Sequence, residues 1–331
     1  MKAIRIVGNK GLASLVLERD VQRPEAQSGQ LLIRVEAAGL NRADILQSLG
    51  QYPAPPGVPI DVPGLEYAGV VEAIGDDVAG FNLGDRVMGL VGGGAFAEYL
   101  VAEKSEILPI PGALSFAQAA CIPEAFATAF DALVTQGGLV ASDRVLIHAI
   151  GSGVGVAALQ ICRAWGALTL GTSRSETKLR SCVSEYGLNV PLLCSEVPAF
   201  AEAARTSTQG RGVSLVVDLV GGPYLTETFQ AMETRGRIIL VGLLGGSTVE
   251  LNLRMLMQKR IHLTGTVMRS RSREEKASVT QAIIDHLIPM FQSKVLRPKL
   301  DSVFVFDQLS DAIQRMQSNR SFGKIVLTWP H

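Results

Sequence analysis

A glycine-rich turn joins an apolar, strand-like run to a helix-like run in the middle of the chain. It follows residues 144–149 and reads Gly151, Ser152, Gly153, Val154 and Gly155. Glycines at such a junction let backbone N–H groups approach a pyrophosphate, and the start of the helix adds a dipole that favours the anion. The spacing G-x-G-x-G is shorter than the full dinucleotide fingerprint. The turn predicts a dinucleotide site, and a tight turn without a ligand is the alternative.

The end of the next strand carries hydroxyl and basic side chains where an acid is common. Residues 168–171 read as that strand, and Ser173, Arg174 and Lys178 follow it. A site that prefers NADH places Asp or Glu here to hold the ribose hydroxyls, whereas these three side chains can donate to a 2′-phosphate. We therefore predict NADPH as the cofactor. Ordinary solvated charges on the next helix remain the alternative for Arg174 and Lys178.

Apolar strand-like runs alternate with helical segments from residue 127 to residue 264. The strand-like runs are residues 144–149, 168–171, 214–220 and 237–241, and the helical ones are 154–165 and 176–186. Apolar strands that are separated by helices are typical of a doubly wound parallel sheet. We therefore predict an α/β Rossmann domain over residues 127–264. His148, at the end of the first of these strands, is expected to be structural.

The flanking parts of the chain read as short strands, turns and a few helices. Residues 31–36 and 68–74 are strand-like, and residues 52–59 between them form an extended, proline-rich loop that begins with Tyr52. Toward the C-terminus we predict a long helix, a strand, a helix and a strand over residues 274–291, 302–306, 309–317 and 324–328. We expect residues 265–331 to return to the first domain, residues 1–126, and to complete it.

The overall composition limits the partners and the compartment. The 331 residues suggest two domains, and 31 basic residues balance 31 acidic ones. A neutral chain has no general attraction for nucleic acid or anionic lipid, so we expect neither nucleic acid nor a membrane as a partner. The uncharged residues 145–162 contain glycines and a histidine, which favours a strand–turn–helix unit over a membrane span. Four cysteines without a C-x-x-C pair and no signal-peptide pattern predict a cytoplasmic protein.

Several motifs together resemble one enzyme superfamily. Residues 64–75 resemble the G-x-E-x-x-G-x-V signature of the medium-chain dehydrogenase/reductase superfamily, and residues 84–87 follow in the usual place. Its zinc-independent quinone oxidoreductases are similar at residues 41–44, at Tyr52 with its proline loop, and at residues 92–99. The tumour-suppressor-inducible branch of that family is similar at residues 148–155, 269–271 and 323–327. The resemblance covers nearly the whole chain and implies a Rossmann domain plus a mainly-β, GroES-like catalytic domain.

The same resemblance predicts that no metal is bound. Zinc alcohol dehydrogenases need a Cys, a His and a second Cys where this sequence has Asn41, Leu65 and Glu124. Leucine cannot bind a metal, and one carboxylate does not make a zinc site. The four-cysteine lobe expected after residues 84–87 is missing as well. We therefore expect chemistry without a metal.

A substrate that no metal polarises must already be electrophilic. A quinone fits, because hydride addition yields an aromatic hydroquinone, and an α,β-unsaturated carbonyl fits by addition at its β carbon. We predict NADPH-dependent quinone reduction; an alkenal or enone reductase and an NADPH-binding protein with little turnover are the alternatives. Tyr52 is the predicted catalytic contact to the substrate oxygen, and a tyrosine that only packs the proline loop is the alternative.

The resemblance also implies roles for residues elsewhere in the chain. It places Ser152 against cofactor or substrate, as the second predicted catalytic residue. The further predicted cofactor contacts are Asn41, Thr128, Gly242, Leu243, Val267 and Lys324. A turn residue, a packing residue and a surface charge are the alternatives for Asn41, Thr128 and Lys324. We expect a homodimer, with the apolar residues 261–267 as the candidate sheet edge.

Overall fold

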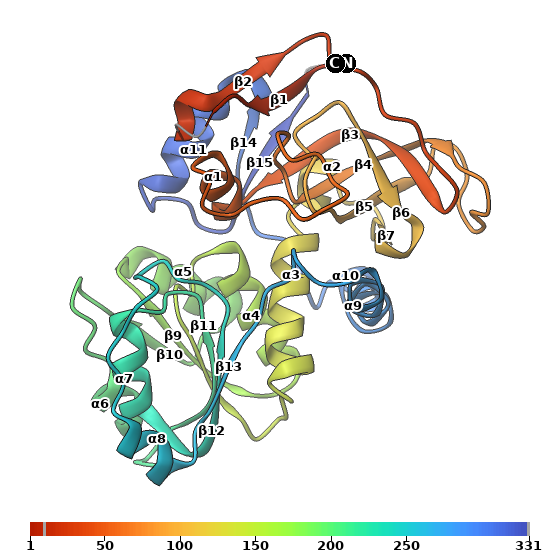
Figure 1. Cartoon of the computed structure of the whole chain (residues 1–331). Helices are drawn as coiled ribbons and strands as arrows, with labels where there is room; N and C mark the ends of the chain where they lie inside the picture. The colour runs from red at the N-terminus through yellow and green to blue at the C-terminus, as the bar shows by residue number, and fades with distance from the viewer. Residues whose placement is uncertain (9–10, 330–331) are drawn as a thin grey trace. The chain divides into compact units, whose positions relative to one another are not determined.

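The computed structural model describes residues 1–8 and 11–329, and the chain divides into two compact units (Figure 1). The first unit comprises Met1–Glu124 and Met268–His331, and the second comprises Ala125–Val267. The sequence placed the corresponding boundaries after residues 126 and 264. Among the described residues, no helix is long and apolar enough to cross a membrane.

The second unit is built on a six-stranded parallel sheet with the strand order β10-β9-β8-β11-β12-β13. In chain order these strands are β8 (Arg144–Ile147), β9 (Leu168–Ser173), β10 (Val190–Leu193), β11 (Val213–Asp218), β12 (Met232–Leu240) and β13 (His262–Gly265). The order reverses between β8 and β11, because β9 and β10 are added on one side and β12 and β13 on the other. Such a reversal is where doubly wound folds bind their ligands.

Helices cover this sheet, and they explain why its central strands are apolar. Val145, Leu146 and Ile147 of β8 are fully buried, as are Leu215 and Val216 of β11. The helices are α3 (Pro123–Phe130), with a π-helical continuation Asp131–Gln136, α4 (Gly153–Ala164), α5 (Glu176–Tyr186), α6 (Ala201–Ser207), α7 (Pro223–Ala231) and α8 (Leu253–Lys259). The prediction of a doubly wound α/β sheet is confirmed.

The first unit is mainly β and closes around its own apolar core. Its seven-stranded sheet has the order β14-β15-β3-β4-β5-β7, with β6 also paired to β3. The strands of the whole unit, of which β1 and β2 pair only with each other, are β1 (Ala3–Ile6), β2 (Leu15–Glu18), β3 (Gln30–Leu40), β4 (Glu66–Ile74), β5 (Arg86–Leu90), β6 (Tyr99–Glu103), β7 (Ile107–Pro109), β14 (Leu300–Val305) and β15 (Lys324–Thr328). Because β15 pairs antiparallel with β3, the last strand of the chain completes a sheet that begins near its start.

Helices of 4 to 14 residues complete the first unit. They are α1 (Arg42–Ser48), α2 (Phe116–Ala119), α9 (Arg273–His286), α10 (Ile288–Gln292) and α11 (Leu309–Gln317), with 3-10 turns at Gly11–Ser14, Lys104–Glu106 and Phe306–Gln308. Of these, α1 leads into the proline loop and α9 begins the returning segment. The bounds predicted for α11 and β15 are confirmed, as are those of α5 in the second unit.

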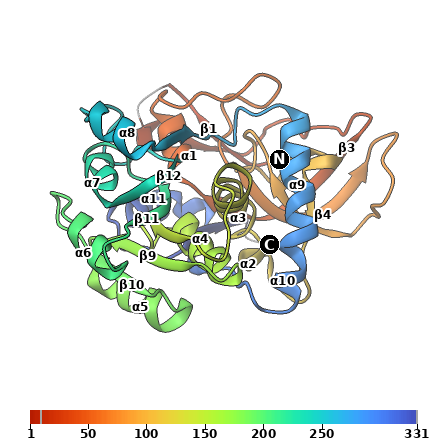
Figure 2. The same cartoon turned by 90° about the horizontal axis from the view of Figure 1, so that it is seen from below.

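The prediction of one long helix over residues 274–291 is wrong, because two helices occupy this stretch. α9 ends at His286 with Leu287 as its C-cap, and α10 starts at Ile288; Figure 2 labels the two one after the other along the blue segment. Pro289 has no N–H to donate to the preceding turn, and its ring excludes a continuous helix there. Proline is tolerated at the first turn of a new helix, which is where it stands in α10.

Candidate active site

The glycine turn of the second unit is tightly built. Ser152 is the N-cap of α4, and its Oγ accepts the Gly155 N–H at 3.0 Å. A Cβ atom at Gly155 would lie 2.6 Å from the carbonyl oxygen of Ala149, so only glycine lets α4 pack this closely. The first N–H groups of α4 have no acceptor within the helix. Besides the Gly155 N–H, which Ser152 accepts, the first turn of α4 thus offers backbone donors and a positive dipole end at the carboxyl edge of the sheet, as an anion site requires.

Lys178 lies directly over this turn. A Cβ at Gly151 would come within 2.8 Å of its Cδ, although the two residues belong to neighbouring βα units. Ser173 closes β9 and accepts the Ser175 N–H at 3.0 Å, while Arg174 is exposed beside it. The pKa of Tyr224 on α7 is raised to about 12, chiefly by burial. The positive charge of Arg174 acts against this rise. The structure thus brings the predicted basic residues to the edge that carries the glycine turn.

The other predicted residues of the second unit have more varied surroundings. Thr128 is buried in α3, whereas Leu243 and Val267 are about half exposed. The N–H of Gly242 donates to the carbonyl of Asp218 at 3.1 Å, which fixes the loop after β12 against the end of β11. Among the described residues, Oδ2 of Asp218 is fully buried without a hydrogen-bond partner, so this edge also holds an unused acceptor.

His148 is structural, as predicted, and the structure shows why. Its two ring nitrogens lie 2.9 Å from the hydroxyls of Thr172 and Thr228. Because Thr228 donates its own hydrogen to the Tyr224 carbonyl, it accepts from Nε2, and Nδ1 then accepts from Thr172. Burial lowers the pKa of His148, which keeps the ring neutral in this arrangement.

In the first unit, a buried network joins Asn41, Glu66 and Lys324. The ammonium of Lys324 lies 2.5 Å from Glu66 Oε1 and donates to Asn41 Oδ1 at 2.6 Å and to the Leu40 carbonyl at 3.2 Å. Asn41 Nδ2 donates to Glu66 Oε1 at 2.9 Å, and the Glu124 N–H donates to Oε2 at 2.8 Å. Glu66 Oε1, Asn41 Oδ1 and the Leu40 carbonyl together use all three hydrogens of the Lys324 ammonium. A bond from Lys324 to a pyrophosphate therefore requires an exchange with one of them.

Asp44 lies beside this network with its carboxyl group out of contact with water. It is 3% exposed, and its two oxygens accept the N–H groups of Asn41 at 2.8 Å and of Gly64 at 3.0 Å. Burial raises the pKa of Asp44 from 3.8 to about 7, against the opposite effect of these bonds and of Lys324. Its protonation state therefore differs between the folded and unfolded chains at mildly acidic pH.

We expect Asp44 to make the protein less stable as the pH rises from 5 to 7. The folded protein keeps this proton up to about pH 7, whereas the unfolded chain loses it near pH 4, so ionisation is penalised only in the folded state. Over this window the free energy of unfolding falls by about 2 kcal/mol more in the wild type than in Asp44→Asn. Urea unfolding at both pH values measures it.

Asp85→Asn is the matched control for this pH dependence, because Asp85 accepts the Asn82 N–H at 2.8 Å in an exposed turn. It should follow the wild type. Parallel pH profiles for the wild type and Asp44→Asn would contradict the assignment.

Tyr52 stands in the loop after α1, half-buried, with the Arg269 guanidinium 5.1 Å from its ring centroid. Burial and the negative charge of Glu124 raise the pKa of Tyr52, and Arg269 lowers it. Burial being the largest of these effects, the phenol keeps its proton near neutral pH. Tyr52 is therefore a hydrogen-bond donor rather than a base.

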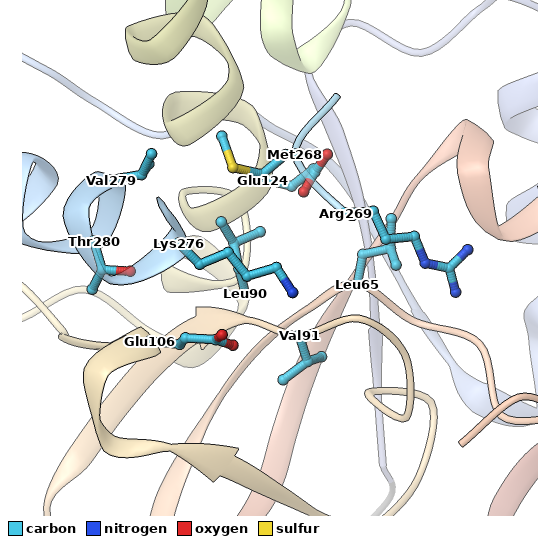
Figure 3. Close-up of a pocket in the computed structure, with 10 residues that line it drawn as sticks. All are labelled: Leu65, Leu90, Val91, Glu106, Glu124, Met268, Arg269, Lys276, Val279 and Thr280. Carbon is cyan, nitrogen blue, oxygen red and sulfur yellow. The ribbon is translucent and has the colours of Figure 1, made fainter. Parts of the chain in front are cut away.

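The first unit also contains a small cavity of about 20 Å³, and one water molecule fills such a volume. It is lined by Leu65, Leu90, Val91, Glu106, Glu124, Met268, Arg269, Lys276, Val279 and Thr280 (Figure 3). Lys276 and Glu106 lie on one side of it, and Leu65 and Arg269 lie on the other. Burial raises the pKa of Glu106, and Lys276 lowers it. The guanidinium of Arg269 points away from the cavity.

Comparisons with known proteins identify the family. A model described as "Zinc-binding dehydrogenase" matches residues 153–284, and "Alcohol dehydrogenase GroES-like domain" matches residues 27–112. The quinone oxidoreductase of Rattus norvegicus is 31% identical over 333 residues, which is 99% of this chain and 97% of that protein. The chain belongs to the medium-chain dehydrogenase/reductase superfamily. As a member it is an oxidoreductase, and its superfamily works with a nicotinamide cofactor.

Other superfamily members are similar over nearly the same length. The synaptic vesicle membrane protein VAT-1 homolog-like of Mus musculus is 28% identical over 344 residues, covering 99% of this chain and 81% of that protein. The crystal structure of a quinone oxidoreductase from Pseudomonas syringae pv. Tomato DC3000 has a TM-score of 0.88 at 27% identity, with 99% of each chain covered. The predicted pairing of a GroES-like domain with a Rossmann sheet is confirmed.

The name of the matching dehydrogenase model implies zinc, but the donor set of this superfamily member does not fit it. Leu65 supplies no ligand atom, and the amide oxygen of Asn41 already accepts from Lys324. Within residues 1–8 and 11–329, no group of three or more His, Cys, Asp or Glu side chains could hold a metal. The buried thiol of Cys121 contacts the Ala117 carbonyl, and burial raises its pKa. These residues give zinc no tetrahedral ligand set.

Two residues that the structure brings to the site are absent from the predicted set. Glu66 is fully buried and holds both Asn41 and Lys324, and a glutamate directly before an apolar, strand-like run was a signal for it. Arg269 contacts Tyr52 but lies in a short polar segment with no pattern that indicates burial. Both lie in segments that carry the family resemblance.

Proposed function

We propose that this protein reduces quinones with NADPH by hydride transfer, without a metal. The observation that carries the proposal is Tyr52, a phenol held protonated beside a guanidinium in a unit whose described residues include no group that could hold a metal ion. The similarity to the quinone oxidoreductase of Rattus norvegicus supports the substrate class. The motifs at residues 148–155, 269–271 and 323–327 further favour the tumour-suppressor-inducible branch.

NADPH, when bound, supplies the hydride, and the second unit offers the groups that would hold it. The turn from Gly151 to Gly155, with Ser152 as the N-cap of α4, suits the pyrophosphate. Ser173, Arg174 and Lys178 suit the 2′-phosphate, because two cations and a hydroxyl favour an anion where an acid would repel it. The remaining proposed contacts are Thr128, Gly242, Leu243 and Val267 of this unit, together with Asn41 and Lys324 of the first unit.

Tyr52 is the proposed donor to the substrate oxygen. As hydride adds to a quinone, negative charge develops on this oxygen, and a hydrogen bond from a fixed phenol strengthens with that charge. Arg269 makes the phenol a stronger donor by lowering its pKa, while Glu124 and burial keep it protonated. Two electrons and one proton convert the quinone into the hydroquinone anion, and a second proton completes the product.

We further propose a cytoplasmic homodimer that is joined along β13. All four residues of this terminal strand are exposed, and an uncovered strand edge favours pairing with another strand. Sedimentation velocity on the wild type and on Leu263→Lys tests this, since a charge at this edge should shift the protein toward the monomer.

The cofactor assignment predicts a selective loss of NADPH affinity. We expect Arg174→Ala with Lys178→Ala to raise the Kd for NADPH by about 10- to 100-fold, and the Kd for NADH by less than about threefold. Only NADPH carries the phosphate that these side chains would bind. Calorimetric titration with each cofactor measures the ratio.

The matched control for this double variant is Arg180→Ala on the same helix. Arg180 pairs with Glu176 at 2.6 Å, and 77% of its side chain is exposed, so its loss should leave both Kd values unchanged. Equal losses for NADPH and NADH in the double variant would exclude the 2′-phosphate site.

An enone or alkenal reductase is the second candidate, because the same phenol can hold the oxygen of an α,β-unsaturated carbonyl. Comparing kcat/KM for a small ortho-quinone and a small enone separates the two functions. A preference for the enone by orders of magnitude would replace the quinone assignment. Binding of NADPH without turnover of either substrate would favour the third possibility, a binding protein.

A further inference from the structure

Arg269 is a buried guanidinium that joins three separate segments of the first unit. It is 6% exposed. Its Nε donates to the Gly92 carbonyl at 2.8 Å, Nη1 to the Tyr52 carbonyl at 2.9 Å, and Nη2 to Gln47 Oε1 at 2.7 Å. All three acceptors are uncharged. A cation buried against neutral acceptors gains no direct ion pair to offset its desolvation, so its value to the protein lies in geometry.

These contacts bind the proline loop, residues 52–59, and the segments next to it. Gln47 also donates from Nε2 to the Ile60 carbonyl at 3.1 Å, which ties α1, the helix that leads into the loop, to the residue after the loop. Gly92 forms the support of the loop, since a Cβ there would lie 3.0 Å from Val58 and 3.1 Å from Pro55. The planar guanidinium thus binds Tyr52 at the start of the loop, Gln47, which contacts the residue after the loop, and Gly92, which packs against it.

We propose that Arg269 is a positioning residue for Tyr52, which sets the direction of the phenol toward the substrate oxygen. The backbone bond fixes where the Tyr52 side chain begins, and the guanidinium over the ring fixes the plane of the ring. The inference rests on the proposed function, in which Tyr52 is the donor. Hydrogen bonding to a developing charge depends steeply on distance and direction, so a loosened loop lowers the rate without lowering cofactor affinity.

Arg269→Lys is the sharpest test, because it keeps the charge and removes the fork. One ammonium cannot reproduce the planar set of bonds to Gly92, Tyr52 and Gln47. We expect kcat for a small ortho-quinone to fall by about 10- to 100-fold, while the Kd for NADPH stays within about twofold. Arg273→Lys is the matched control, because Arg273 forms a 2.9 Å pair with Glu103 and is 71% exposed. It should change neither quantity.

A double-mutant cycle with Tyr52→Phe separates positioning from a general effect on the fold. Once the hydroxyl is gone, Arg269→Lys should cost no more than about a further twofold in kcat. A purely structural role would lower the residual rate of Tyr52→Phe by the full factor, and that result would overturn the proposal. So would a wild-type kcat in Arg269→Lys.

Gln47→Leu provides a second, milder variant if Arg269→Lys does not fold. It removes one acceptor of the fork and the bond to Ile60, and its loss of kcat should also vanish in the Tyr52→Phe background. A loss that persists there would count against positioning.

If Tyr52→Phe alone leaves the rate unchanged, or the wild type turns over neither a quinone nor an enone, the proposed function and the positioning role of Arg269 are both refuted. If Tyr52→Phe lowers kcat but Arg269→Lys keeps the wild-type kcat, only the positioning role of Arg269 is refuted.

Discussion

Tyr52→Phe should lower kcat for quinone reduction by about 100- to 1000-fold, which is the usual effect of removing one donor to a developing oxyanion. The ring and its contact with the Arg269 guanidinium remain in this variant, so the loop keeps its packing. The Kd for NADPH should stay within about twofold, because Tyr52 is not one of the proposed cofactor contacts. Single-turnover kinetics with NADPH in excess measures the chemical step directly.

Tyr99→Phe is the matched control for Tyr52→Phe. Tyr99 lies in β6 of the same unit, with the Arg23 guanidinium 4.0 Å from its ring centroid, so it repeats the pairing of a phenol with an arginine. Its rate should equal that of the wild type. A Tyr52→Phe enzyme at more than about a third of the wild-type kcat would mean that the phenol only packs the loop.

Lys324→Met should lower the free energy of unfolding by about 3 kcal/mol or more, since removal of one partner leaves a buried charge without compensation. Glu66 is fully buried and Lys324 is 6% exposed, so water cannot replace the lost ammonium. The carboxylate would keep only the Asn41 amide and the Glu124 N–H as donors. Urea unfolding at pH 7 measures the loss.

Two further variants show whether the effect of Lys324→Met comes from the buried pair. Lys2→Met is the surface control, because Lys2 pairs with Glu98 at 3.5 Å with a third of its side chain exposed, and such pairs contribute about 1 kcal/mol or less. Adding Glu66→Leu to Lys324→Met should recover part of the loss, because no charge then remains unpaired. A Lys324→Met protein as stable as the wild type would refute the buried pair.

The same variant also tests the proposed contact of Lys324 with the cofactor. At a temperature where Lys324→Met is fully folded, a Kd for NADPH that rises by about 10-fold would indicate that the ammonium leaves Glu66 or Asn41 to bind phosphate. An unchanged Kd would leave Lys324 with a structural role only.

Much of the fold could be predicted because its signals are local. The apolar runs that became β8, β11 and β15 are continuous in the sequence, and continuous burial is what a central parallel or paired strand requires. The bounds of α5 follow from Ser175 at its N-cap and from Gly187, whose φ of 62° ends the helix. β10 escaped prediction because Pro191 weakens a strand pattern, although proline is tolerated on a terminal strand.

The candidate site divides in the same way. The glycine turn, Ser152 and the charges after β9 are short, contiguous patterns, so the sequence alone predicts a dinucleotide site at this edge with a preference for an anion. The lack of a full zinc ligand set was also predicted from the sequence, because Leu65 has no atom that can bind a metal and Asn41 has an amide in place of a thiolate.

Only the tertiary structure decided how the buried charges are neutralised and how Tyr52 is held. Arg269 is 217 positions from Tyr52, and Lys324 is 283 positions from Asn41, so no local pattern reports these contacts. A lysine or arginine reads as a surface charge until the packing removes its water and supplies partners, and that packing depends on a returning segment whose strand pairs with β3. Sequence thus determined which chemistry the chain carries, while the long-range pairing of its ends decided which charged groups are buried and what each can do.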